Sequence, residues 1–343
     1  MRAAVYYAAN DLRVMDVPLP ECGPGDVRIK LHYCGVCGTD HHIFHGDGGA
    51  VPVPAGTVIG HEFSGVVDAV GDAVTRFKPG DRVSADPNDW CGACYYCMSG
   101  KAHFCTNMKG YGTTYPGGFA EFIRVPEKQV YRLPDTLPLK IGSQSETTSC
   151  CVNGIDLCDL KAGSNVLIIG AGPIGLMMLQ LARNGGAGRI IISEPVAEKR
   201  ALALKLGADL AVDPLKEDLA AVLKKEFPNT DCVIEAAGTK GTQAAAIDLA
   251  GKTGTVMLFG LVAPDTTITL KPFEVFNREL KITSSFINPY TFGRAISLLD
   301  GRRVALDEII TDIVPLEDIL KVFTDPWYRS RGKVLIRMPG AQE

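Results

Sequence analysis

The sequence predicts an α/β protein that combines a β-rich part with a doubly wound parallel sheet. Three observations carry this prediction. The first third of the chain holds short β-branched and aromatic runs between Gly- and Pro-rich turns. After about residue 160, strand-like and helix-like runs alternate regularly. Where this alternation begins, the stretch GAGPIG lies between a strand-like run and a helix-like run.

The composition indicates two globular domains. The chain has 343 residues, of which 46% are hydrophobic and 22% charged, as in proteins with a sizeable core. The net charge is −4 and no basic block occurs, which argues against nucleic acid or an anionic membrane as the main partner. The first residues lack a signal-peptide core, and no clean apolar run reaches the thickness of a bilayer. We therefore expect a cytoplasmic protein.

The N-terminal strands are predicted from five short runs: RAAVYY, LRVMDV, VRIKLHYCGV, FSGVVDAV and FAEFIRV. Turns such as ECGPGD and FKPGDRV separate them. Many short strands at this spacing predict a barrel or a sandwich-like unit.

The second part is predicted from six strand-like runs: NVLIIG, RIIISE, ADLAVDP, DCVIEAAG, TVMLFGL and LKITSSF. Helix-like stretches such as PIGLMMLQLARNGG lie between them, which implies βαβ units and a parallel sheet. Six strands fit the two halves of a Rossmann fold. A helix, FGRAISLLDG, and a strand, KVLIRM, follow after about residue 288 and are free to return to the first domain.

The stretch GAGPIG predicts a dinucleotide-binding turn. Its first glycine makes the turn, its second lets backbone N–H groups approach a pyrophosphate, and its third lets helix and strand pack closely. About 20 residues further on, the next strand ends at the expected acceptor for a ribose 2′-hydroxyl. The cofactor site is therefore expected to include Gly170, Gly172, Pro173, Ile174, Gly175 and Glu194.

The same region bears on the choice between NAD and NADP. Glu194 should repel a 2′-phosphate, which favours NAD. Lys199 and Arg200 follow closely, and either side chain is long enough to reach a phosphate. Such residues more often line the adenine edge or face solvent. We expect NAD, and we include both basic residues in the candidate cofactor site.

The cysteines and histidines indicate metal sites in the N-terminal part. Seven of the eleven cysteines lie between Cys22 and Cys105, and all six histidines lie in the first 103 residues. Four cysteines within fifteen residues can wrap one tetrahedral zinc and leave no position for a substrate. A nucleic-acid zinc knuckle is the alternative, but the loop has only Lys101 as a basic residue. The predicted structural zinc ligands are Cys91, Cys94, Cys97 and Cys105.

A second metal site is dispersed along the chain. A catalytic zinc needs three protein ligands and an exchangeable position, and spacing alone does not choose among the candidates. CGVCGTDHH and GHEF offer cysteine, histidine and carboxylate side chains, and SQSETTSCC adds one carboxylate and two thiols. These candidates are Cys34, Cys37, His41, His42, His61, Glu62, Glu146, Cys150 and Cys151.

The motifs CGVCGTD, GHEFSGVV, the four-cysteine lobe, GGFAEF and GAGPIG, in this order, resemble the zinc-dependent medium-chain dehydrogenase/reductase family, and most closely its sorbitol, xylitol and related polyol dehydrogenases. The resemblance covers essentially the whole chain. It implies a GroES-like β-rich catalytic domain, residues 1–147 and 288–343, and a Rossmann NAD-binding domain, residues 148–287. It also implies one catalytic and one structural zinc ion per subunit, and a homodimer or homotetramer.

By this resemblance, Cys37 and His61 are ligands of the catalytic zinc, and Glu62 matches a carboxylate at or near the metal. In polyol-type members a glutamate, here Glu146, contributes directly or through water. In simpler alcohol dehydrogenases a cysteine four positions later, here Cys150, is the ligand. We expect Glu146 to be the ligand. A metal site rich in carboxylates is harder, and exchanges its ligands more readily, than a site with two thiolates, and this suits a chelating diol.

The resemblance implies reversible oxidation of a secondary hydroxyl of a polyol to a ketone, with zinc as Lewis acid and NAD as hydride acceptor. Thr39 and His42 match a hydroxyl and a histidine that carry the proton to solvent. Together with Glu62 they are the expected catalytic residues. The substrate is then a small-molecule polyol or ketose.

The chain departs from the polyol-type pattern at several positions. Two threonines, Thr147 and Thr148, replace a Pro–Leu pair, and Asn153 stands where a histidine is usual. Ile287 and Asn288 stand where sorbitol-type enzymes carry an Arg–Tyr pair, so a polyol other than sorbitol is favoured.

Other functions remain open. Within the enzyme class these are a 2,3-butanediol-type diol dehydrogenase and an L-threonine dehydrogenase. A zinc-free NADPH quinone reductase is disfavoured, because it has no reason to hold Cys37, His61 and Glu62 with a four-cysteine lobe. A non-catalytic zinc- and nucleotide-binding protein is the alternative from another class. It would bind NAD without turning over any alcohol.

Overall fold

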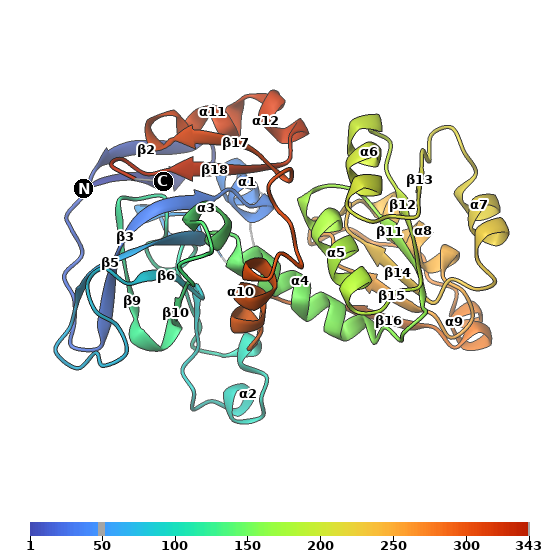
Figure 1. The fold of residues 1–343 in the computed structure, drawn as a ribbon, viewed down its shortest axis with the longest axis horizontal. Coiled ribbons are helices and arrows are strands. Elements are labelled where there is room, and N and C mark those ends of the chain that lie inside the picture. The colour runs from blue at the N-terminus through green and yellow to red at the C-terminus, as the bar shows by residue number, and fades with distance from the viewer. Residues whose placement is uncertain (47–51, 342–343) are drawn as a thin grey trace. The chain divides into compact units, whose positions relative to one another are not determined.

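The computed structural model describes residues 1–46 and 52–341. The chain splits into two compact units, each with its own hydrophobic core (Figure 1). The first unit holds residues 1–149, 289–301 and 309–343, and the second holds residues 150–288 and 302–308. The α/β fold class expected from the sequence is confirmed.

The first unit is rich in β-structure, and the five strand-like runs predicted in it all form strands. Its main sheet has the order β10-β6-β5-β3-β18-β17, with β9 also paired to β3. These strands are β3 (Asp26–Gly35), β5 (Glu62–Val70), β6 (Arg82–Ala85), β9 (Phe122–Pro126), β10 (Val130–Arg132), β17 (Ile310–Pro315) and β18 (Lys333–Arg337). A three-stranded sheet is formed by β2 (Asp11–Asp16), β1 (Arg2–Ala8) and β4 (Thr57–Val58), and β7 (Asn88–Asp89) pairs with β8 (Lys109–Gly110).

Short helices accompany these sheets. They are α1 (Gly38–His45), α2 (Tyr95–Met98), α3 (Leu139–Gly142), α10 (Phe292–Asp300), α11 (Ile319–Thr324) and α12 (Pro326–Ser330). Single 3₁₀ turns lie at η1 (Ala102–Phe104), η2 (Glu127–Gln129) and η3 (Leu316–Asp318). The core of the unit is formed where the inward side chains of the strands meet, with Phe44 of α1 and Phe323 of α11 stacked at 5.1 Å between ring centroids.

The strand β18 joins this sheet from the far end of the sequence. It pairs antiparallel with β3, so that Leu335 lies opposite Gly35, and parallel with β17. Because β3 also pairs with β5, Gly35 lies opposite Glu62 on its other side. A strand from the end of the chain is therefore in register with β3 and β5 at one point, next to the motifs that hold the candidate metal ligands.

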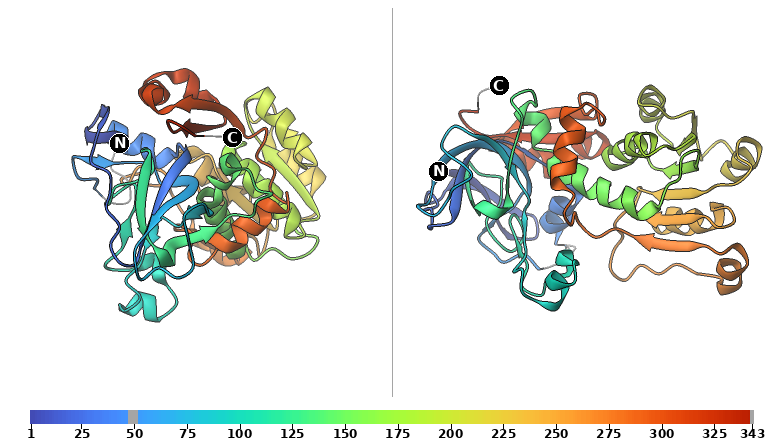
Figure 2. Two further views of the ribbon diagram at one scale, coloured as in Figure 1. Left: turned by 60° about the vertical axis from the view of Figure 1, so that its left-hand side comes forward. Right: turned by 60° about the horizontal axis from the view of Figure 1, so that its bottom comes forward.

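The second unit contains a six-stranded sheet in which every pair is parallel and helices lie on both faces (Figure 2). The strand order is β13-β12-β11-β14-β15-β16. Numbered along the chain within this unit, it is 3-2-1-4-5-6, as the Rossmann prediction requires. The strands are β11 (Asn165–Ile169), β12 (Arg189–Ser193), β13 (Leu210–Val212), β14 (Cys232–Glu235), β15 (Thr255–Leu258) and β16 (Lys281–Ser284).

The predicted helices of this unit form, and two further helices appear. The predicted ones are α5 (Pro173–Asn184), α6 (Ala197–Lys205), α7 (Leu219–Glu226) and α8 (Lys240–Leu249). The additional ones are α9 (Pro272–Arg278) and α4 (Ser145–Cys158), whose first residues belong to the first unit. Helix α4 begins within a polar run, residues 143–149, that is buried throughout. The sequence therefore has no apolar stripe there that would predict a helix.

Among the residues that the structure describes, no helix combines the length and hydrophobicity that crossing a membrane requires.

Candidate functional site

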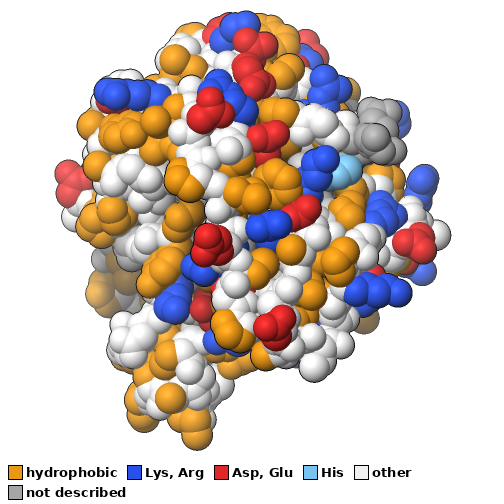
Figure 3. Space-filling view, turned by 90° about the vertical axis from the view of Figure 1, so that its left-hand side faces the viewer, with side chains coloured by type: hydrophobic (Ala, Val, Ile, Leu, Met, Phe, Trp, Pro, Cys, Tyr) orange, Lys and Arg blue, Asp and Glu red, His pale blue; other side chains and the backbone are white. Residues whose placement is uncertain are grey.

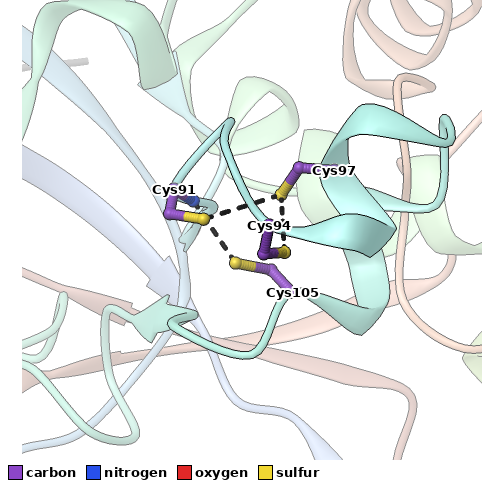
Figure 4. Close-up of side chains that lie close together, drawn as sticks. All are labelled: Cys91, Cys94, Cys97 and Cys105. Atoms are coloured by element: carbon purple, nitrogen blue, oxygen red, sulfur yellow. Dashed lines mark hydrogen bonds between the residues drawn. The ribbon is translucent and has the colours of Figure 1, made fainter.

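Four cysteines form a compact group on a small lobe of the first unit (Figure 4). The sulfur atoms of Cys91, Cys94, Cys97 and Cys105 all lie within 4.8 Å of one another. The backbone N–H of Cys91 donates to Cys105 Sγ at 3.3 Å, and that of Ala93 donates to Cys91 Sγ at 3.5 Å. Backbone N–H groups, first that of Cys97, lower the pKa of Cys94 to about 6, whereas burial and the neighbouring thiol of Cys94 raise the pKa of Cys97 to about 12. The thiolate that binds metal is therefore favoured at Cys94 and disfavoured at Cys97. Four converging sulfurs fit a closed tetrahedral zinc site.

The lobe has little else to hold it together. Helix α2 has no buried residue, and Tyr95 and Met98 are 79% and 75% exposed. Figure 3 shows hydrophobic side chains gathering on the protruding lobe at the bottom of the view. A segment without a core gains its folding free energy from another source, and a structural metal is a common one. This lack of buried apolar surface supports the metal assignment independently of the cysteine spacing.

A second group brings together Cys37, His61 and Glu62, whose ligand atoms also lie within 4.8 Å of one another. Cys37 is the N-cap residue of α1, directly after β3. Glu62 begins β5, which pairs with β3, and His61 precedes it. His61 and Glu62 are 8% and 0% exposed. Their side chains offer nitrogen, sulfur and oxygen donors at a buried point, which suits zinc.

Asp40 supports this group, and the sequence analysis did not identify it. Its Oδ2 accepts a hydrogen bond from the backbone N–H of Cys37 at 2.8 Å, and its Oδ1 lies 3.5 Å from His61 Nδ1. Burial lowers the pKa of His61, but the charges of Asp40 and Cys37 outweigh this and raise it well above its usual value. A carboxylate behind a ligating histidine fixes the orientation of its ring. The signal that could have found it is the capping-box position, three residues after Cys37.

Lys333 also reaches this group and was not foreseen. Its Nζ lies 2.6 Å from Oε1 and 2.5 Å from Oε2 of Glu62. The two residues are 271 positions apart, so no local motif could have joined them.

Glu146 and Cys150, the two candidates for a further ligand, lie outside the compact group. Glu146 is in the first turn of α4 and is 7% exposed. Burial lowers the pKa of Lys333, but Glu62, Cys37 and, as the smallest contribution, Glu146 raise it. Cys150 lies one turn further along the same helix and is only partly buried. The choice between them stays a prediction.

The two relay candidates lie on α1, close in sequence to Cys37. Thr39 and His42 are both partly exposed, as a route from a buried site to solvent requires. Their roles in proton transfer stay predictions.

The glycine-rich turn has the geometry that a dinucleotide needs. Gly170 has a φ of 101°, which favours glycine, and Gly172 is the N-cap residue of α5, with Pro173 and Ile174 in its first turn. A Cβ at Gly175 would lie 2.0 Å from the carbonyl oxygen of Gly170, so helix and turn approach closely only without a side chain. The backbone N–H groups in the first turn of a helix have no acceptor within that helix, so those of α5 can bind a pyrophosphate.

Glu194 lies beside this turn. Its Oε2 accepts from the backbone N–H of Ala171 at 2.8 Å, and its Oε1 from that of Val196 at 3.0 Å. The side chain is therefore fixed at the end of β12, where a ribose hydroxyl is expected.

The two basic residues that follow differ in their surroundings. Arg200 donates to the carbonyl oxygens of Glu194 and Pro195 and lies 3.4 Å from Asp213, so its guanidinium is already engaged. Lys199 is half-buried on α6.

The sequence matches two protein families. Residues 23–135 match the alcohol dehydrogenase GroES-like domain, and residues 173–301 match the zinc-binding dehydrogenase family. The first stretch contains both cysteine-bearing motifs, and the second begins at Pro173, within the glycine-rich turn.

Several known proteins are similar over nearly the whole chain. D-arabinitol dehydrogenase 1 of Uromyces fabae is 32% identical over 93% of this chain and 91% of its own length. D-arabitol-phosphate dehydrogenase of Enterococcus avium is 35% identical over 95% and 94%. L-threonine 3-dehydrogenase of Rhizobium rhizogenes is 38% identical over 93% of each. A candidate zinc-binding dehydrogenase of Sinorhizobium meliloti, solved with bound NADP, superposes with a TM-score of 0.94 at 37% identity and covers 98% of each chain.

Proposed function

The chain belongs to the zinc-dependent medium-chain dehydrogenase/reductase family, and from this premise we propose that it oxidises a secondary hydroxyl of a polyol to a ketone, with NAD as hydride acceptor. The observation that carries the proposal is the group of Cys37, His61 and Glu62 at the ends of two paired strands. Three protein donors at a buried point fit a catalytic zinc that keeps one exchangeable position.

A zinc ion held there would polarise a substrate hydroxyl as a Lewis acid. The chain's own residues have the remaining tasks. Asp40 keeps the ring of His61 oriented through the contact between Oδ1 and Nδ1. Thr39 is proposed to accept the proton of the substrate hydroxyl while it releases its own hydroxyl proton into the relay, and His42 is proposed to pass a proton from the relay to solvent. Glu146 is proposed to contribute its carboxylate, directly or through water.

The polyol assignment is supported by the names of two similar proteins, which act on D-arabinitol and D-arabitol phosphate. The main alternative is an L-threonine dehydrogenase, because a relative with that name is 38% identical. A vicinal diol such as 2,3-butanediol remains a third candidate.

We propose NAD rather than NADP. A 2′-phosphate would have to lie beside the fixed carboxylate of Glu194, while Arg200 is occupied by two carbonyl oxygens and Asp213. The similar structure from Sinorhizobium meliloti holds NADP, so both cofactors belong in the test.

The deciding experiment follows the absorbance of reduced nicotinamide with a panel of substrates. The panel contains sorbitol, xylitol, D-arabinitol, galactitol, the available polyol phosphates, 2,3-butanediol, L-threonine and ethanol, each with NAD and with NADP. Turnover of a polyol with NAD supports the proposal. Turnover only of threonine, butanediol or ethanol contradicts the polyol assignment and keeps the metal centre. Absence of turnover with two bound zinc ions would favour a non-catalytic binding protein.

We further propose a cytoplasmic homodimer or homotetramer. The sequence places the domain boundaries at residues 147/148 and 287/288, whereas the compact units divide at 149/150 and 288/289 and the second unit also takes in residues 302–308. Size-exclusion chromatography with light scattering tests the oligomeric state.

A further inference from the structure

Glu235 is a buried carboxylate of the second unit to which the proposed function gives no role. It is the last residue of β14 and is 0% exposed. Its Oε1 accepts hydrogen bonds from the backbone N–H groups of Ala237 and Gly238, at 2.9 and 2.8 Å, and from Thr242 Oγ1 at 2.8 Å. All three donors are neutral, so they hold the carboxylate in place without cancelling its charge.

The other carboxylate oxygen of Glu235, Oε2, is buried next to Gly260. A Cβ at Gly260 would lie 2.7 Å from this oxygen. Within residues 1–46 and 52–341, Oε2 accepts no hydrogen bond and no basic side chain forms an ion pair with Glu235. Burying a charge costs free energy unless another charge compensates it. We therefore looked for a cation that the protein meets when it works.

Glu235 lies at the edge of the sheet where a dinucleotide is expected. Strand β14 is next to β11, across the point at which the strand order reverses. Glu235 is paired with Ile169, the residue before the glycine-rich turn, and a Cβ at Gly170 would lie 3.2 Å from the backbone nitrogen of Ala237. Each half of such a sheet binds one mononucleotide. Since Glu194 places the adenosine half over the first three strands, the nicotinamide half belongs to the strands that begin with β14.

The nicotinamide ring is the part of the cofactor whose charge changes in the reaction. It is a cation in the oxidised cofactor and becomes neutral when it accepts a hydride, in NAD and NADP alike. A fixed negative charge in a medium of low dielectric constant attracts the cation and has no comparable effect on the neutral ring. The phosphates and riboses are the same in both states, so the ratio of the two affinities reports on the ring.

We propose that the uncompensated charge of Glu235 stabilises the cationic nicotinamide ring, so that the protein binds the oxidised cofactor more tightly relative to the reduced one. Glu235 would act through its charge, without touching a reacting atom. The consequence is a bias toward oxidation of the alcohol and toward release of the reduced cofactor. This inference rests on the proposed function and adds to it a preference for one redox state of the cofactor.

The experiment titrates wild type and Glu235→Gln with NAD⁺ and with NADH by isothermal titration calorimetry, at one pH and one ionic strength. The readout is the Kd for NAD⁺ divided by the Kd for NADH. Asp231→Asn is the matched control, because it removes a carboxylate directly before β14, at the other end of the same strand. Asp231 likewise accepts hydrogen bonds, from the backbone N–H of Asn165 at 2.8 Å and from Asn229 Nδ2 at 2.9 Å.

In Glu235→Gln we expect the ratio to rise about fivefold or more, because binding of NAD⁺ weakens while binding of NADH changes by less than about twofold. Asp231→Asn should leave the ratio as in wild type. An unchanged ratio in Glu235→Gln, or an equal rise in Asp231→Asn, would overturn the proposal. Loss of both affinities by the same factor would also overturn it, because Glu235 would then only hold the turn after β14.

Leu261→Lys provides a second test if Glu235→Gln does not fold. Leu261 is 62% exposed, and a Cβ at Gly238 would lie 2.6 Å from its carbonyl oxygen. A lysine there adds a positive charge near the same edge, so the ratio should rise about twofold or more, whereas Leu261→Met should leave it unchanged. Equal ratios in these two variants would contradict the proposal.

The wild-type titration separates this inference from the proposed function. A wild-type protein that binds no nicotinamide cofactor would contradict the proposed function itself. Cofactor binding by wild type, with a ratio that none of the charge-changing variants alters, would contradict the role of Glu235 alone.

Discussion

Asn153 Nδ2 donates a hydrogen bond to the backbone carbonyl oxygen of Ile287 at 3.1 Å, and another to Ser285 Oγ at 2.8 Å. Both Asn153 and Ile287 are positions at which the chain departs from the polyol-type pattern. Ile287 has a φ of 45°, a left-handed conformation that is unfavourable for a β-branched residue. The two departures are therefore in contact, and the asparagine holds the carbonyl of a strained residue in place.

Asn153→Ala should lower the free energy of unfolding by about 1–2 kcal/mol, because two partly buried hydrogen bonds are lost and the left-handed turn is released. Chemical denaturation measures the change. Asn277→Ala, at an exposed position on α9, is the control and should change stability by less than about 0.5 kcal/mol. Equal effects of the two variants would show that the contact is unimportant.

Glu146→Ala should reduce occupancy of the catalytic metal or most of the activity, whereas Cys150→Ala should keep both. The reason is that a carboxylate shell suits an exchangeable site for a chelating substrate. Metal analysis of the purified variants and turnover of the best substrate are the measurements. The opposite ranking would make Cys150 the ligand.

Gly35→Ala should disrupt the same site from its other side. Its new Cβ would lie 2.0 Å from Glu62 Oε2 and 2.4 Å from Gln144 Nε2, so buried charged and polar groups must move. We expect a loss of about 1–3 kcal/mol of stability, the usual cost of overpacking, together with weaker zinc binding. Gly38→Ala is a matched control in the same motif, because a Cβ there meets nothing within 4 Å. Similar behaviour of the two variants would show that Gly35 is not needed to leave room for the side chain of Glu62.

Cys94→Ser should remove one of the two zinc ions and make the four-cysteine lobe sensitive to protease, because α2 has no buried residue to replace the metal. Zinc content and limited proteolysis are the measurements. Cys22→Ser, a partly buried cysteine outside both groups, should keep both ions. A Cys94→Ser protein with full zinc content would rule out the four-sulfur site.

Glu194→Gln should raise the KM for NAD about tenfold or more, because a hydrogen bond to a charged acceptor is weakened, and should lower the KM for NADP. Initial-rate kinetics with both cofactors give the comparison. Glu198→Gln, on the exposed part of α6, should leave both values unchanged. If neither KM responds to the change at Glu194, the carboxylate does not contact the ribose.

Most of the fold could be predicted from local patterns. The parallel strands are short buried runs. The turn from Gly170 to Gly175 can be recognised from consecutive residues alone. Helix α4 could not be predicted, because its first turns bury polar side chains instead of an apolar stripe.

The site divides in the same way. The four cysteines are close in sequence, and Cys37, His61 and Glu62 lie in two short motifs. Asp40 also lies in one of these motifs, but its position three residues after Cys37 indicates a helix cap and does not show that its other oxygen faces His61. Lys333 depends on the register of β18 against β3, and such non-local pairing leaves no mark in the sequence around it.

The pairing of β18 with β3 also sets an order of assembly during synthesis. Lys333 leaves the ribosome 271 residues after Glu62, a delay of roughly 15–50 s at ordinary rates of translation. Through that interval β3 lacks its partner on one side, and the carboxylate of Glu62 lacks its counter-charge. The strands of the second unit, in contrast, come from one continuous stretch, residues 165–284, and can pair as soon as it is made. The nascent chain therefore completes its nucleotide-binding sheet before the metal-binding unit, although the metal-binding motifs are translated first.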